Sequence, residues 1–276
     1  MLGKLFKYEF KGSYKLMLTI YGITIAISIL GALVFSTSAI QNMNQTGLPA
    51  NILGLLFVAV IILYVLTAFA LSIITYVYMC TRFYKTMYSN QGYLTHTLPV
   101  KPLTTFHVKL ITSLVWMFSS ILIMFLSIFI LLCGITKGNI FSHAAQNTFT
   151  EELLPFLGMS TGQMVAFIIF ACSFSCLSYL LMVFASASIG QLFHQNKVGF
   201  SILAGIILYF IQQIAGIIVI FLFNESMFSF IEDTVPTFAD ILFSPYMLVS
   251  ISLALFFTVA CYVICIVIVQ KHLNLD

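Results

Sequence analysis

Residues 52–79 read ILGLLFVAVIILYVLTAFALSIITYVYM, and no charged side chain interrupts them. An α-helix needs about 20 mainly apolar residues to cross the hydrocarbon core of a bilayer, because each residue adds about 1.5 Å. The segment therefore predicts a transmembrane helix. Five further runs meet the same criterion: 16–35, 110–133, 164–190, 198–223 and 247–269. The sequence predicts an all-α membrane protein with six transmembrane helices.

The composition agrees with lipid as the main solvent of this chain. Of its 276 residues, 61% are hydrophobic and 7% are charged, whereas a soluble domain carries roughly 25% charged residues. A water-soluble fold would lack the polar cover that its surface needs. No segment between the runs is long enough to form a soluble domain. We therefore expect residues 1–276 to form a single transmembrane domain.

The positions of the basic residues predict the topology. Ten of the 11 lie before the first run, after the last run or in alternate gaps, and only Lys137 lies in the other gaps. Because basic loops stay in the cytoplasm, both termini are expected there. The ten are Lys4, Lys7, Lys11, Lys15, Arg82, Lys85, Lys101, Lys109, Lys197 and Lys271.

Residues 1–15 predict an amphipathic helix. On a helical wheel Lys4, Lys7, Lys11 and Lys15 fall within about 80° of one another. Such a helix would lie in the cytoplasmic headgroup layer with its lysines toward anionic lipid. The simpler alternative is basic flanking charge of the kind that fixes topology, and the two interpretations are compatible.

The cytoplasmic loop 80–109 is longer than the 2–8 residues that usually join two helices. It is rich in aromatic and apolar side chains, among them Tyr88, Tyr93 and Leu94. Pro99 ends any helix, and Pro102 suits the first turn of the next one. We expect an extension of the second span, a short element over 88–97 and a bend into the third span. The loop either binds a partner protein or folds against its own helices.

The extracytoplasmic loops are predicted at 134–163 and 224–246. The second contains a mixture of apolar and acidic residues, and Pro236 and Pro245 bracket its latter part. It is too short for a seventh span, so a re-entrant or interfacial element at the outer face fits it better.

Polar side chains within the spans are candidates for a substrate path. Gln212 and Gln213 lie near the middle of the fifth span, and an amide in hydrocarbon must find a partner. The full candidate set is Tyr64, Thr67, Thr75, Tyr209, Gln212 and Gln213. Structural hydrogen bonding between helices is the alternative for all six.

Small residues in the fourth and fifth spans predict close helix packing. The fourth span has Ala171, Ser175, Ser178, Ser186 and Gly190, and the fifth has Gly199, Ser201, Gly205 and Gly216. The cysteine pairs 172/176 and 261/265 each share a helix face; helix packing explains them better than a soft metal ion does. We expect no metal site.

Several functional classes are disfavoured. No G-x-x-x-x-G-K-[ST] phosphate loop, H-E-x-x-H or G-x-S-x-G motif is present. No charged residue lies in the middle of a span, where proton relays and voltage sensors place theirs. The chain is therefore not expected to be an enzyme, to carry a cofactor or to bind nucleic acid.

The order of these parts resembles the permease subunit of type-2 ABC exporters, in particular the small permeases of Gram-positive bacteria. The resemblance covers essentially the whole chain. It rests on the lysine-rich start MLGKLFKYEFK (1–11), six spans and the segment YSNQGYLTHTLPV (88–100). Gln91-Gly92-Tyr93-Leu94 and Leu98-Pro99-Val100 match the family pattern, although Gln91 stands where an acidic residue is usual.

The resemblance implies a function. ATP and Mg²⁺ would bind separate cytosolic ATPase subunits, and 86–98 would be the coupling helix that contacts them. Its contact residues would be Tyr88, Gln91, Gly92, Tyr93, Leu94, Thr95, Leu98 and Pro99. A second permease subunit would pair with this one in the bacterial plasma membrane, and spans 2 and 5 would face the path of an amphipathic or hydrophobic peptide, lipid or drug.

Two alternatives remain. The first is a non-transporting scaffold or sensor subunit that signals through the same loop, and the second is a secondary transporter. Transport that depends on a partner's ATPase would distinguish the permease from both.

Overall fold

The computed structural model describes residues 2–36, 48–89, 92, 101–136, 160–193, 196–223, 240 and 242–271. Its described residues form six long helices and no strand. All six are long and apolar enough to cross a membrane. Five of the predicted spans lie within them, and the span predicted at 198–223 ends one residue beyond α9, so the prediction of six apolar helices is confirmed. The helices are α1 (Leu2–Ser36), α3 (Leu48–Tyr88), α5 (Pro102–Ile135), α8 (Thr161–Gly190), α9 (Lys197–Leu222) and α12 (Pro245–Lys271).

The helix ends clarify three predictions. The second span does extend to Tyr88, and the third begins at Pro102. Residues 2–15 are not a separate element, since they form one uninterrupted helix with the first span. The outer loops were predicted at 134–163 and 224–246. Residues 137–159, 224–239 and 241 lie outside the described residues, whereas 134–135, 161–163 and 245–246 belong to α5, α8 and α12.

The apolar surfaces of these helices are consistent with a lipid environment. Phe221 and Leu222 of α9 are 78% and 72% exposed, and Leu55 of α3 is 72% exposed. Large apolar side chains at this exposure would be unfavourable in water but are stable in hydrocarbon.

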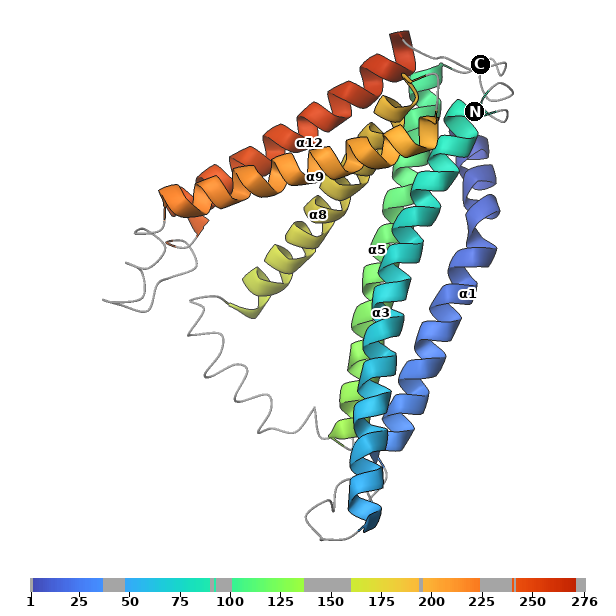
Figure 1. Cartoon of the computed structure of the whole chain (residues 1–276), viewed down its shortest axis with the longest axis vertical. Coiled ribbons are helices and arrows are strands. Elements are labelled where there is room, and N and C mark those ends of the chain that lie inside the picture. The colour runs from blue at the N-terminus through green and yellow to red at the C-terminus, as the bar shows by residue number, and fades with distance from the viewer. Residues whose placement is uncertain are drawn as a thin grey trace. The chain divides into compact units, whose positions relative to one another are not determined.

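The chain divides into two compact units (Figure 1). The first, unit 1, comprises Met1–Leu5, Met79–Leu114 and Thr150–Asp276. The second, unit 2, comprises Phe6–Tyr78 and Val115–Phe149. Helices α8, α9 and α12 thus belong to unit 1, together with the end of α3 and the start of α5.

Unit 2 holds α1, α3 and α5 together through close backbone contacts and buried hydroxyl groups. A Cβ atom added at Gly134 of α5 would lie 2.5 Å from the Ala32 Cα of α1, so only glycine allows this approach. The Tyr21 hydroxyl donates to the Trp116 carbonyl oxygen at 2.9 Å. These contacts tie α1 to α5 over much of their shared length.

Unit 1 is organised around α8, which contacts both α9 and α12. A Cβ atom at Gly190 would lie 2.5 Å from the Ser201 Cα, and one at Gly205 would lie 3.4 Å from the Ser186 side chain. The prediction that these small residues permit close packing of the fourth and fifth spans is therefore confirmed. Between α12 and α8, the Thr258 hydroxyl donates to Ser178 at 3.0 Å.

Candidate functional site

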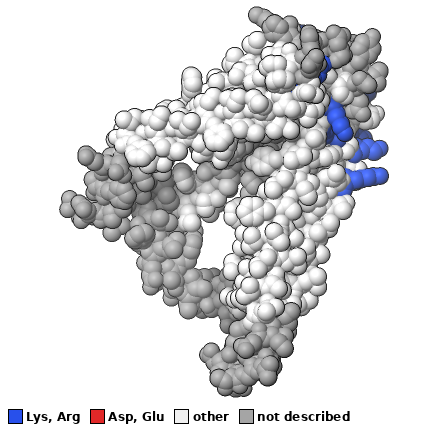
Figure 2. Space-filling model, in the orientation of Figure 1, with Lys and Arg blue, Asp and Glu red and all other residues white. Residues whose placement is uncertain are grey.

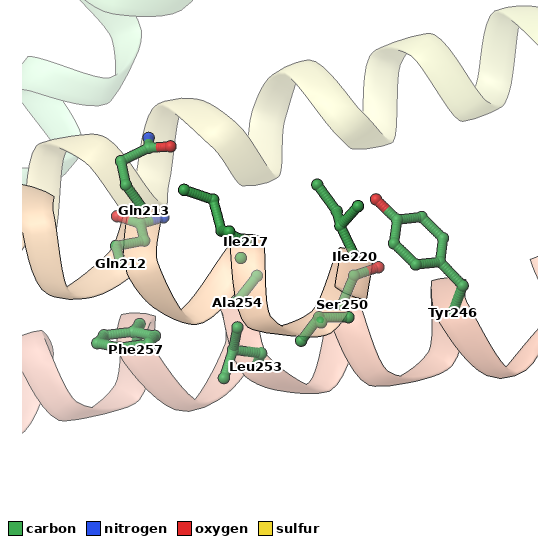
Figure 3. Close-up of a pocket in the computed structure, with 11 residues that line it drawn as sticks. Gln212, Gln213, Ile217, Ile220, Tyr246, Ser250, Leu253, Ala254 and Phe257 are labelled. Carbon is green, nitrogen blue, oxygen red and sulfur yellow. The ribbon is translucent and has the colours of Figure 1, made fainter. Parts of the chain in front are cut away.

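A pocket of about 270 Å³ lies in unit 1 along α9 and α12. Its polar groups lie toward its two ends (Figure 3): Gln212 and Gln213 at one end, and Tyr246 and Ser250 at the other. Apolar side chains lie between them. The lining residues are Gln212, Gln213, Gly216, Ile217, Val219, Ile220, Tyr246, Ser250, Leu253, Ala254 and Phe257.

The amides of this pocket have no hydrogen-bond partner among the described residues. Gln212 is half-buried and Gln213 is exposed at the surface of this single chain. The Tyr246 hydroxyl likewise bonds no described residue, whereas Ser250 donates to the Met247 carbonyl oxygen at 2.9 Å. An unsatisfied amide in hydrocarbon costs several kcal/mol. The pocket therefore requires a polar occupant, water or a partner helix.

The three candidate path residues on α3 have hydrogen-bond partners, unlike the amides of the pocket. Tyr64 shares a 2.8 Å hydrogen bond with Ser127 of α5, and the Thr67 hydroxyl donates to the Tyr64 carbonyl oxygen at 2.8 Å. Thr75 is buried, donates to the Leu71 carbonyl oxygen at 2.7 Å and lies 3.2 Å from the Ser120 hydroxyl. Structural hydrogen bonding accounts for these three residues in unit 2.

Tyr209, the remaining candidate for the path, is 44% exposed and packs edge-on against Phe210. It does not line the pocket. Of the six predicted path residues, the structure thus brings only Gln212 and Gln213 into one pocket. It adds Tyr246 and Ser250, which the sequence analysis missed because a tyrosine and a serine near a helix start carry no distinctive signal.

Of the predicted coupling segment 86–98, the structure describes residues 86–89 and Gly92. Tyr88, at the end of α3, is 3% exposed, and its hydroxyl shares a 2.8 Å hydrogen bond with Ser188 of α8. Gly92 is buried, and its N–H donates to the Ser89 carbonyl oxygen at 2.6 Å. The other predicted contact residues lie outside the described residues: Gln91, Tyr93, Leu94, Thr95, Leu98 and Pro99.

Aromatic rings fix the two helix ends that flank this segment. Phe83 of α3 stacks on Phe184 of α8 with ring centres 3.9 Å apart, and it meets Phe106 of α5 edge-on. The His107 Nε2 atom lies 2.9 Å from the Tyr262 hydroxyl of α12. We call these five residues, together with Tyr88 and Ser188, the coupling base. It connects the ends of α3 and α5 to α8 and α12.

A buried lysine adds a polar contact near the coupling base. Lys109 is only 5% exposed, and its ammonium group donates to the Thr86 hydroxyl at 2.7 Å. A lysine buried this deeply nearly always has a polar partner. Since Thr86 belongs to α3 and Lys109 to α5, the contact gives a further connection between the two helices that lead into the predicted coupling segment.

Four lysines on the N-terminal half of α1 are exposed: Lys4, Lys7, Lys11 and Lys15. Figure 2 shows lysine and arginine side chains in blue along one edge of the view. The six cysteines are free thiols. No three metal-ligating side chains come together within the described ranges.

Comparison of the chain with protein-family models, with curated proteins and with solved structures finds no match.

Proposed function

We propose that the chain is the permease subunit of an ATP-driven exporter, with ATP and Mg²⁺ bound by separate cytosolic ATPase subunits. The observation that supports this most is the pocket along α9 and α12, where two mid-span amides have no partner in the described part of the chain. A protein that only packed its helices would gain nothing from unsatisfied amides in hydrocarbon, but a protein that moves a polar or amphipathic molecule needs such groups.

The lining of the pocket favours an amphipathic cargo. Amide groups at one end and hydroxyl groups at the other can hydrogen-bond to polar parts of a molecule, while Ile217, Leu253 and Ala254 contact its apolar part. No lining residue carries a charge. A peptide, lipid or drug with separated polar groups fits this chemistry better than an inorganic ion does.

The coupling base supplies a route from the ATPase to the pocket helices. Residues 86–98 would contact the ATPase, with Tyr93 and Leu94 as the apolar contacts. The Tyr88 side chain is buried against α8, so its role is to position the segment and not to touch the partner. A displacement of the segment would reach α8 through Ser188 and Phe184, and α12 through Tyr262.

The basic ends of the helices lie in the cytoplasm of a bacterial cell, with both termini there. The lysine-bearing turns of α1 lie at the headgroup layer. The outer re-entrant element predicted within 224–246 precedes α12, which begins at Pro245. A second permease subunit completes the path by covering the exposed side of α9.

Co-purification tests the proposal. The full chain is purified in mild detergent with a candidate phosphate-loop ATPase subunit, as the unmodified protein and as Leu94→Asp. We expect stable association that Leu94→Asp abolishes. Asn90→Asp is the matched control, because it adds the same charge to the segment without removing an apolar side chain, and it should keep the complex. Absence of association in the folded unmodified protein would favour a scaffold or a secondary transporter.

A further inference from the structure

A groove of about 430 Å³ runs between α1 and α5 in unit 2. Its volume lies within the range of small-molecule sites, roughly 300–1,000 Å³. Trp116 and Tyr21 form its floor and are 4% and 6% exposed. The walls are Phe10, Tyr14 and Leu18 of α1 and Ser119, Leu122 and Ile123 of α5. Above the aromatic floor, the α1 wall is thus aromatic at Phe10 and Tyr14 and aliphatic at Leu18, and the α5 wall is aliphatic at Leu122 and Ile123.

The floor is held rigidly. The Phe10 ring stacks on the Trp116 indole with ring centres 4.5 Å apart and planes 16° apart. The Tyr21 hydroxyl donates to the Trp116 carbonyl oxygen and lies 2.9 Å from the Ser120 hydroxyl. A preformed groove loses little conformational entropy when it binds a ligand. The opposite end is open, since Leu18 is 57% exposed and Leu122 is 54% exposed.

Positive charge flanks the aromatic end of this groove. Lys11 lies three residues before Tyr14, and Lys15 lies three residues before Leu18, so each lysine is a surface neighbour of a wall residue. Lys7 is seven residues before Tyr14 and lies on the same side. All three are exposed. Glu9, the one acidic residue of α1, lies roughly 160° around the helix from the centre of the lysine row.

We infer that this groove binds an anionic phospholipid. One acyl chain would lie along Leu18, Leu122 and Ile123, and the phosphate would face Lys7, Lys11 and Lys15. The groove belongs to helices long and apolar enough to span a membrane, so a bilayer lipid is the molecule that it meets. Aromatic side chains commonly mark the level of the headgroups, and each lysine near the surface favours an anionic over a neutral lipid by roughly fivefold. The inference is independent of the proposed function.

The chain contains one tryptophan, and it forms the floor of the groove, so its fluorescence reports occupancy. The full chain is reconstituted in vesicles of phosphatidylcholine to which phosphatidylglycerol with brominated acyl chains is added, and quenching is compared with that by brominated phosphatidylcholine. We expect phosphatidylglycerol to be preferred by at least about fivefold. Equal quenching by the two lipids would overturn the inference.

Three variants locate the binding. Replacing Lys7, Lys11 and Lys15 by glutamine should remove the preference for phosphatidylglycerol. The matched control, glutamine at Lys85, Lys101 and Lys197, removes the same charge elsewhere and should retain it. Ser119→Phe fills the groove and should weaken quenching by both lipids. A preference that survives the first variant, or that the control loses to the same extent, would contradict a site at α1.

Discussion

The polar residues of α3 and those of α9 look alike in sequence but differ in their surroundings. On α3, Tyr64 and Thr75 bond to serine hydroxyls of α5 within unit 2. On α9, Gln212 and Gln213 have no partner in the described part of the chain and line a pocket. A polar group whose hydrogen bonds are satisfied stabilises a helix pair, whereas one left unsatisfied needs a ligand, water or a partner subunit.

The largest effect is expected from removing the unsatisfied amides. The double variant Gln212→Leu/Gln213→Leu should lower ATP-driven efflux by about tenfold or more, because hydrogen bonds to the cargo are lost. Its thermal stability should stay equal or rise, since two unpaired amides leave the hydrocarbon. The measurement is efflux of a panel of fluorescent amphipathic dyes and peptides from proteoliposomes that contain the ATPase. Undiminished efflux of every transported compound would contradict a role of the amides in the path.

The next effect concerns the packing of α8 on α9. Gly190→Ala should destabilise the protein by about 1–3 kcal/mol, because the added methyl group would meet the Ser201 backbone. Gly216→Ala is the control, since nothing described lies within 4 Å of its added Cβ, and it should be neutral or stabilising. Thermal unfolding in detergent compares the two. Equal unfolding temperatures would show that α8 and α9 do not pack as closely as described.

Removing a hydroxyl group that already has hydrogen-bond partners should lower stability and leave efflux nearly unchanged, which is the opposite of the result expected for the amides. Thr75→Val should lower the free energy of unfolding by about 1–2 kcal/mol, because it removes a buried hydroxyl that bonds to Leu71 and Ser120. Efflux, corrected for the amount of folded protein, should change less than about twofold. A large loss of efflux without loss of stability would place Thr75 in the cargo path. The polar residues of α3 and α9 would then not differ in function.

The smallest effect is expected at the coupling base. Tyr88→Phe removes a hydrogen bond to Ser188, which keeps its bond to the Phe184 carbonyl oxygen at 2.8 Å. The cost in stability should be about 0.5–1.5 kcal/mol, with binding of the ATPase retained because the side chain is buried. Chemical denaturation measures the loss of stability, and co-purification measures binding of the ATPase. Loss of the complex with unchanged stability would mean that Tyr88 itself contacts the partner.

The apolar runs predicted the six helices because length and hydropathy alone determine whether a helix can span a bilayer. Their ends were harder to predict: the third run was placed at 110–133, yet α5 begins at Pro102 and includes Lys109. Helices can continue into the headgroup layer, where charged side chains reach water.

The site was predicted less completely than the helices. Gln212 and Gln213 are conspicuous in an apolar span, but Tyr246 and Ser250 join them through the contact of α12 with α9, and no local pattern reveals which residues meet across helices. The same limit applies to Thr75, whose partner Ser120 lies on another helix. Residue type alone suggested candidates for the path. The packing of the helices shows which of these candidates have hydrogen-bond partners and which do not.

Access of water to the pocket along α9 tests the central claim most directly. The native cysteines are replaced by serine or alanine, Gln213→Cys is introduced, and a membrane-impermeant maleimide is added to proteoliposomes that contain the ATPase. We predict that the thiol reacts at a rate that changes at least several-fold between ATP-bound and nucleotide-free states, while Ile214→Cys, on the exposed apolar surface of α9, stays unreactive. A Gln213→Cys thiol that never reacts, or reacts equally in both states, would contradict a cargo path at this pocket.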